Sequence, residues 1–283
     1  MIGEVDKKFS VLLSLYVKEN PLYLQECLES LVSQTRPASE WVIVEDGPLS
    51  QELYQVLDSY QERYPDLIKR VPLEQNVGLG LALREGMLHC SYELVARMDT
   101  DDIARTDRFE RQLVCFEQDP TLDICGSHIL EFDIDPQHPT AVRKVPLLHD
   151  DIVNYQKSRS AFNHMTVMFK KSSVVKAGNY EDAPLMEDDM LWVRMFLSGA
   201  KGMNIDDYLV DVRTGAGMIE RRGGLSYLKK YRAGRKKILE TGFISRFDYY
   251  KTVGIQSIVA LVPHKIRFLI FTQLLRNKKE LSE

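Results

Sequence analysis

The 283-residue sequence has few cysteines and no long run of apolar residues. Its four cysteines, Cys27, Cys90, Cys115 and Cys125, lack the spacing of metal ligands, so we expect reduced core thiols and no disulfide framework. No segment reaches the roughly 20 apolar residues of a membrane-spanning helix. Acidic residues precede a short apolar run at the N-terminus, which argues against a signal peptide. We therefore expect a cytoplasmic chain, and its 44% hydrophobic content is sufficient for a large core.

Acidic residues are scarce in the last part of the chain. Residues 221–283 hold 15 Lys and Arg against 4 Asp and Glu, a charge of +11, which leaves 22 basic and 37 acidic residues, or −15, for residues 1–220. Mixed with apolar pieces such as 255–262 and 266–271, these cations suit a segment lying on an anionic membrane face. A helical subdomain with a solvated basic face is an equal alternative. The basic residues lie away from the crevice predicted below, so no nucleic-acid partner is expected.

Short apolar runs alternate with helical patterns through residues 1–120. Strands are predicted at 9–16, 41–44, 68–73 and 93–98. Asn20 as N-cap and Pro21 in the first turn predict the start of the first helix. Two further helical patterns separate the later strands. This βαβαβαβ order predicts an α/β, Rossmann-like fold whose parallel sheet carries helices on both faces.

Polar residues follow each of these strands. They are Tyr16 after the first, Asp46 after the second, Asn76 with Gly78 after the third, and Asp99 with Asp101 after the fourth. Parallel sheets bind ligands beyond the carboxyl ends of their strands. Each signal alone is explained by an ordinary turn or by a helix packed close to the sheet. Together the four strand ends predict a nucleotide pocket.

The segment from Arg97 to Asp102 places three carboxylates within four residues, directly after the apolar pattern Leu94-Val95-Ala96. Crowded carboxylates repel one another unless a cation lies among them. The segment therefore predicts a Mg²⁺ or Mn²⁺ site beside substrate phosphates. An acidic turn that caps the next helix is the alternative.

These segments resemble the inverting family 2 glycosyltransferases of the GT-A fold over roughly residues 8–215, most closely the bacterial members that build capsule, exopolysaccharide or lipopolysaccharide repeat units. The resemblance rests on the order and spacing of several motifs. They are Val44-Glu45-Asp46-Gly47, Asn76-Val77-Gly78-Leu79, Ala96 to Asp102, Asp107-Arg108-Phe109, and Glu187-Asp188 with Leu191-Trp192 and Arg194. It implies a GT-A domain over residues 1–220, divided into a nucleotide-binding half (1–102) and an acceptor-binding half (103–220). Residues 221–283 form a basic amphipathic C-terminal region.

The resemblance also implies roles for individual residues. Ser14, Tyr16 and Asp46 match positions that hold the nucleoside, and they suit a uridine ligand. Asn76, Gly78 and Arg84 are expected at the donor as well, although many relatives carry Asn at position 84. Asp99 and Asp101 match the acids that bind Mn²⁺ or Mg²⁺, with Asp99 also near the ribose; the adjacent Asp102 is an alternative ligand.

The acceptor side is expected from the second half of the chain. Glu187-Asp188-Asp189 opens a helical pattern, which the helix dipole alone also favours. In the family motif the Asp, here Asp188, is the general base, and Glu187 lies beside it. His164 is expected to contact substrate, and a structural histidine is the alternative. Arg213 is expected to meet a diphosphate of the donor or of a lipid-linked acceptor, or else to begin the basic surface of the tail. No residue is nominated as the nucleophile that a retaining enzyme would need.

The sequence thus predicts a metal-dependent, inverting transferase. We expect it to move one hexose from a UDP-sugar to a hydroxyl of a glycan, plausibly linked to a polyprenyl diphosphate, at the inner face of the plasma membrane. The Gln-x-x-Arg-Trp signature of processive synthases is missing, which favours single-sugar transfer. A sugar-nucleotide nucleotidyltransferase is one alternative, but it needs a glycine- and lysine-rich loop after the first strand, and residues 16–20 lack glycine. A non-catalytic sugar-binding module is the other.

Overall fold

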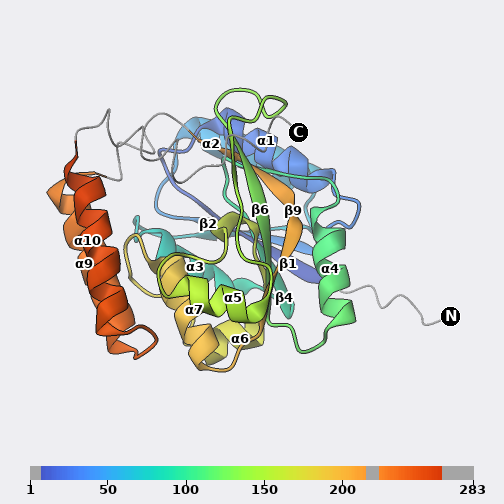
Figure 1. The fold of residues 1–283 in the computed structure, drawn as a ribbon. Helices are drawn as coiled ribbons and strands as arrows, with labels where there is room; N and C mark the ends of the chain where they lie inside the picture. The colour runs from blue at the N-terminus through green and yellow to red at the C-terminus, as the bar shows by residue number, and fades with distance from the viewer. Residues whose placement is uncertain (1–7, 215–222, 263–283) are drawn as a thin grey trace.

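The computed structural model describes residues 8–214 and 223–262 (Figure 1). One nine-stranded sheet runs through the molecule in the order β3-β2-β1-β4-β8-β6-β9-β5, and β7 pairs with β6. The strands are β1 (Phe9–Leu15), β2 (Glu40–Glu45), β3 (Ile68–Pro72), β4 (Leu94–Arg97), β5 (Ile103–Ala104), β6 (Ile124–Phe132), β7 (Ala141–Arg143), β8 (Met168–Lys170) and β9 (Gly202–Arg213).

The first four strands are parallel, as the sequence predicts. β1 pairs with both β2 and β4, and β2 pairs with β3, all in parallel register. Beyond β4 the sheet is mixed, because β8 lies antiparallel between β4 and β6, and β9 then pairs in parallel with β6. The carboxyl ends of β1 to β4 therefore share one rim, and the second half of the chain extends the sheet from β4.

Helices cover both faces of the sheet (Figure 1). α1 (Pro21–Val32), α2 (Gln51–Arg63) and α4 (Arg108–Gln118) pack on one face through a core that includes Leu28, Leu57 and Phe109. The other face carries α3, α5, α6 and α7. Their bounds are Leu79–His89, His149–Gln156, Lys171–Lys176 and Glu187–Leu197, and their core includes Leu83 and Trp192. Helices on both faces confirm the predicted layers.

The beginning of α1 shows how local sequence sets an element. The Asn20 side chain accepts a hydrogen bond from the Leu22 N–H at 2.9 Å, and Pro21 is the first helical residue. Leu24, Cys27 and Leu28 recur on one face and are fully buried. All four cysteines are free thiols, and Cys27 lies in the core as expected.

α9 (Gly224–Glu240) and α10 (Arg246–Leu261) form a helical pair at one side of the molecule (Figure 1). α9 packs against α7 through a small core that includes Met186, Val193 and Ile238. Among residues 8–214 and 223–262, no helix has both the length and the apolar character needed to cross a bilayer. The expected boundary at 220/221 and the apolar piece at 266–271 lie outside the described residues.

Candidate active site

A buried carboxylate joins the ends of β2 and β3. Asp46 accepts hydrogen bonds from the Val77 N–H at 2.7 Å, the Gly78 N–H at 3.1 Å and the Asn76 side-chain amide at 3.0 Å. Gly47 has a φ of +84°, and a Cβ there would lie 2.6 Å from the Asn76 nitrogen. The structure thus brings together Asp46, Asn76 and Gly78, which the sequence predicts at the donor. Much of the hydrogen-bonding capacity of Asp46 is used to shape this loop.

The acidic segment after β4 forms a compact cluster. Oxygens of Asp99, Asp101 and Asp102 all lie within 4.8 Å of one another. Burial, and then the charge of Asp99, raises the pKa of Asp101 to about 6. Burial and the charge of Asp101 raise the pKa of Asp102 as well. Three carboxylates gathered this closely offer only oxygen ligands and fit a divalent cation such as Mg²⁺ or Mn²⁺.

Arg213 holds this cluster from the end of β9. Its backbone N–H donates to Asp102 Oδ1 at 2.9 Å, and its Nε donates to the Asp101 carbonyl oxygen at 3.3 Å. The guanidinium lies 3.8 Å from the centroid of the Tyr23 ring and pairs with Glu26. These contacts give Arg213 a structural role that the sequence did not suggest, and a diphosphate contact for it stays a prediction.

The acids at the amino end of α7 have different surroundings. Burial raises the pKa of Asp188, and Ser160 Oγ lies 3.4 Å from Asp188 Oδ2 as a donor. Burial and the charge of Asp188 raise the pKa of Glu187 to about 7. Asp189 accepts a 2.6 Å hydrogen bond from the Gln156 amide of α5. Asp189 is therefore tied to α5 by Gln156, whereas the Asp188 carboxyl accepts a long contact from Ser160 and hydrogen bonds from backbone N–H groups at the start of α7.

The loop before α7 carries two residues with unusual backbone angles, Asn179 with a φ of +63° and Leu185 with a φ of +74°. Tyr180, which follows Asn179, has its hydroxyl 2.9 Å from His164 Nε2. Burial, helped by the positive charge of Arg97, lowers the pKa of His164 well below its usual value, so the imidazole is neutral near pH 7. His164 thus lies in a buried pair with Tyr180, and its expected contact with substrate stays a prediction.

The amino end of α3 meets the loop that leads into α7. A Cβ at Gly80 would lie 2.4 Å from the Glu181 carbonyl oxygen and 3.2 Å from Glu187 Cβ. The Asn179 amide donates to the Arg84 carbonyl oxygen at 3.2 Å, and the Arg84 side chain is exposed. The predicted nucleotide half therefore packs against Glu187, the residue before the predicted base. Ser14 is half-buried near the end of β1, and Tyr16 directly follows that strand.

Arg97, at the end of β4, is a site residue that sequence reasoning missed. Its side chain is 2% exposed, and its Nη2 contacts Asp99 Oδ1. Its charge also acts on Tyr180, Glu187 and Asp188 at the other side of the site. The sequence did carry a sign of this role, because Arg97 is a charged residue at the end of an otherwise apolar strand pattern.

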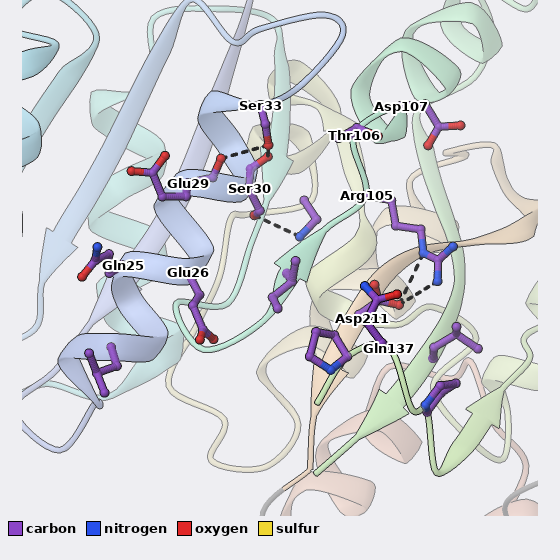
Figure 2. Close-up of a pocket in the computed structure, with 16 residues that line it drawn as sticks. Gln25, Glu26, Glu29, Ser30, Ser33, Arg105, Thr106, Asp107, Gln137 and Asp211 are labelled. Atoms are coloured by element: carbon purple, nitrogen blue, oxygen red, sulfur yellow. Dashed lines mark hydrogen bonds and ion pairs between the residues drawn. The ribbon is translucent and has the colours of Figure 1, made fainter. Parts of the chain in front are cut away.

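A separate pocket lies between α1 and β5 (Figure 2). It has a volume of about 1390 Å³, and its charged lining residues include Glu26, Glu29, Arg105 and Asp211. These groups are engaged within the protein: Arg105 pairs with Asp211 at 3.1 Å, and Glu29 with Arg63 at 3.1 Å. The clustered acids after β4 and the acids at the amino end of α7 do not line this pocket.

Comparison with known proteins places this geometry in a family. The model of Glycosyl transferase family 2 matches residues 10–174, more than half of the chain. The chain belongs to glycosyltransferase family 2. This glycosyltransferase is 39% identical over 267 residues to the amylovoran biosynthesis glycosyltransferase AmsE of Erwinia amylovora, covering 93% of this chain and 97% of that protein. It is 37% identical over 270 residues to the UDP-Gal:alpha-D-GlcNAc-diphosphoundecaprenol beta-1,3-galactosyltransferase of Escherichia coli, covering 95% and 97% of the two chains.

Solved structures show that the family 2 glycosyltransferase has the GT-A fold predicted from its sequence. TarS residues 1–349 of S. aureus, in complex with UDP-GlcNAc, align with a TM-score of 0.60 at 17% identity, covering 94% of this chain and 73% of that one. The mannosyltransferase PcManGT of Pyrobaculum calidifontis, in complex with GDP-Man and Mn²⁺, aligns with a TM-score of 0.62 at 15% identity, covering 93% and 72%.

Proposed function

We propose that this glycosyltransferase moves a single hexose, with inversion, from a UDP-sugar to a hydroxyl of a glycan carried on a polyprenyl diphosphate. The observation that carries the proposal is that Asp99, Asp101 and Asp102 gather after β4, while Gly80, at the start of α3 in the donor half, packs against Glu187, the neighbour of Asp188. Metal-binding acids and a candidate base thus flank one site. A relative at 37% identity is named for UDP-Gal and a diphosphoundecaprenol acceptor, and another for amylovoran biosynthesis, which supports surface-polysaccharide assembly.

The donor lies along the rim of β1 to β4 in this proposal. Ser14, Tyr16 and Asp46 hold the uridine, and the Asn76–Gly78 loop with Arg84 lies beside the diphosphate. A Mn²⁺ or Mg²⁺ ion, when bound by Asp99 and Asp101, would neutralise charge that develops on the departing diphosphate. The PcManGT complex with Mn²⁺, which shares this fold, supports such an ion.

Asp188 removes the proton in the transfer step. The acceptor oxygen forms a bond to the anomeric carbon while its proton passes to the Asp188 carboxylate. The bond from that carbon to the diphosphate oxygen breaks at the same time, and its electron pair leaves with UDP. Attack from the opposite face inverts the centre. The raised pKa of Asp188 strengthens the carboxylate as a base above the pH at which it ionises.

Replacing the base tests this step. Asp188→Asn should lower kcat at least about a hundredfold, because removal of a general base costs about 10² to 10⁴. The affinity for UDP, measured by calorimetry with Mn²⁺ present, should stay near that of the wild type. Asp189→Asn is the matched control, since Asn retains an acceptor for Gln156. Normal turnover by Asp188→Asn would exclude Asp188 as the base.

The proposal also includes a membrane contact through the C-terminal region. The exposed face of α10 carries five large apolar residues, each at least 55% exposed. They are Phe247, Tyr250, Ile255, Ile258 and Leu261. A groove of about 330 Å³ on α9 is lined by Lys229, Arg232 and Lys236. An apolar face on one helix and a cationic groove on the helix that packs against it suit the boundary between acyl chains and anionic headgroups, where a lipid-linked acceptor would be found.

Vesicle binding tests the membrane contact. The protein should sediment with vesicles that contain phosphatidylglycerol and much less with pure phosphatidylcholine, because anionic headgroups attract the cations of α9. The double variant Phe247→Ser/Ile258→Ser should reduce binding by about tenfold or more, since each side chain contributes buried apolar area. Leu88→Ser removes an exposed leucine of α3 as a control. Unchanged sedimentation of the double variant, or a dimer that it abolishes in light scattering, would contradict a membrane role for this face.

A further inference from the structure

α7, the helix that carries the catalytic acids, begins at a residue that cannot cap it. Met186 occupies the N-cap position, and its thioether offers the first N–H groups of the helix no oxygen acceptor. Asn20 caps α1 and Ser245 caps α10 through such an oxygen. The residue before Met186, Leu185, has a φ of +74°, a left-handed conformation that disfavours a bulky side chain. Strained backbone persists only where its surroundings hold it, so contacts from elsewhere in the chain must fix the start of α7.

α9 makes such contacts around Met186. Met186 is 3% exposed and lies against Gly234 of α9, where a Cβ would come within 2.4 Å of Met186 Cγ and 3.1 Å of its Cβ. Only a glycine allows so close an approach. One turn further along α9, Ile238 is fully buried in the same small core as Met186. Lys237 Nζ donates to the Asp182 carbonyl oxygen at 3.0 Å. α9 thus holds both the loop before α7 and the first residue of that helix.

α9 is also fixed to the element that holds Asp189. Arg235 is 2% exposed, and its Nη2 donates to the Lys157 carbonyl oxygen at 2.5 Å. Lys157 directly follows Gln156, whose amide binds Asp189. α9 therefore contacts the residue that precedes the three acids and the backbone beside the residue that ties the last of them. Asp188 lies between these two attachments in the sequence.

We propose that the contact between Gly234 and Met186 positions Asp188, the base of the transfer step, and that turnover depends on it. Both are positioning residues, since they act through Asp188. A base must lie within hydrogen-bond reach of the proton that it removes, and a misplacement of about 1 Å can cost about a hundredfold in rate. The inference rests on the proposed function for the role of Asp188. It gives the C-terminal helical pair a part in the transfer step in addition to the membrane contact.

Reciprocal substitutions test the contact. The rate measured is release of UDP, with Mn²⁺ present and water as acceptor, from the best of four donors, UDP-Glc, UDP-Gal, UDP-GlcNAc and UDP-GalNAc. Gly234→Ala should lower it by about ten- to a hundredfold, because the added Cβ displaces the start of α7. In a Met186→Ala background, which removes the Cγ that this Cβ meets, the same change should cost less than about threefold.

Binding of UDP separates misplacement of the base from a general loss of structure. Calorimetry should give each variant an affinity for UDP within about twofold of wild type, and the stoichiometry counts the folded sites. Gly254→Ala adds the same methyl group to α10, where a Cβ would meet nothing within 4 Å, and should leave the rate unchanged.

Hydrogen exchange measures the contact without turnover. Peptides that cover residues 181–189 should exchange about tenfold faster in Gly234→Ala than in wild type, whereas those of β2 should not change. Lys237→Met removes the bond to Asp182 without adding volume, so it should have a smaller effect of the same sign even where Gly234→Ala does not fold. Lys230→Met, at an exposed position of the same helix, is its control.

Equal exchange and equal UDP release in Gly234→Ala and Gly254→Ala would overturn the inference. So would a loss of rate in Gly234→Ala that Met186→Ala does not reduce, or a loss of UDP affinity as large as the loss of rate. Faster exchange of residues 181–189, combined with no UDP release by wild type from any of the four donors, would support the contact and overturn the proposed function instead.

Discussion

The three adjacent acids at the start of α7 have different environments, because each has different hydrogen-bond partners. Asp189 is fixed by Gln156, Asp188 has one long contact with Ser160, and Glu187 has a buried oxygen without a partner in the described part of the chain. The sequence shows three acids in a row and marks the segment as functional. It does not distinguish the three, because Gln156 and Ser160 come from elsewhere in the chain. Arg97 was missed for the same reason: its importance lies in which buried groups surround it.

The environment of Glu187 predicts a pH-dependent gain in stability on substitution. Its pKa is about 7 in the fold against 4.5 for an ordinary glutamate, so the folded protein keeps a proton that the unfolded chain releases between these values. Glu187 therefore lowers stability progressively as the pH rises from about 4.5 to about 7. Glu187→Gln should raise the free energy of unfolding by about 1 to 2 kcal/mol at pH 8 and by little at pH 4.5.

Urea denaturation of wild type and Glu187→Gln at the two pH values, with EDTA present, measures this difference. Asp58→Asn, at an exposed ion pair with Arg70, is a suitable control for general charge effects. A gain of equal size at both pH values would show that burial of the Glu187 charge is not its cause.

Elements whose determinants are local in sequence were predicted best. α1 has its cap, its proline and its apolar stripe within 13 residues, and β1, β2 and β4 contain apolar runs that are buried on both faces. β5, β7 and β8 have two or three residues each and are set by pairing with distant strands. β8 exists because β4 and β6 leave room for an antiparallel strand between them, and such pairing leaves little periodicity in three residues.

The contact between α3 and the loop before α7 gives a prediction at this scale. Gly80→Ala would place a Cβ 2.4 Å from the Glu181 carbonyl oxygen, which must push α3 away from α7. We expect a loss of about 1 to 3 kcal/mol in the free energy of unfolding, as for overpacking elsewhere. Turnover should also fall, because Glu187 and the Asn76–Gly78 loop move relative to each other.

Gly254→Ala is the matched control, since a Cβ at this helical glycine of α10 would meet nothing within 4 Å. It should stabilise the protein by about 0.5 to 1 kcal/mol through helix propensity. Denaturation and steady-state kinetics on both variants check the prediction. A Gly80→Ala enzyme with normal stability and normal turnover would show that close packing of α3 on this loop is not required.

At the scale of the whole molecule, charge and function are divided along the chain. The acidic body carries the rim of β1 to β4 and the amino end of α7, whereas the basic C-terminal region contributes the α9–α10 pair that packs on α7. The charge asymmetry was visible in the sequence. That this pair presents an apolar face on α10 and a cationic groove on α9 required the structure, since burial of the other faces depends on tertiary packing.

In the proposed mechanism, Asp99 and Asp101 hold a divalent ion that binds the donor diphosphate. Thermal unfolding of wild type and Asp101→Ala, with UDP and with or without Mn²⁺, tests it most directly, and Asp206→Ala, an exposed acid outside the cluster, is the control. The account predicts that UDP raises the Tm of wild type and of Asp206→Ala by several degrees only when Mn²⁺ is present, and leaves Asp101→Ala unchanged. Equal protection of Asp101→Ala by UDP and Mn²⁺ would contradict it.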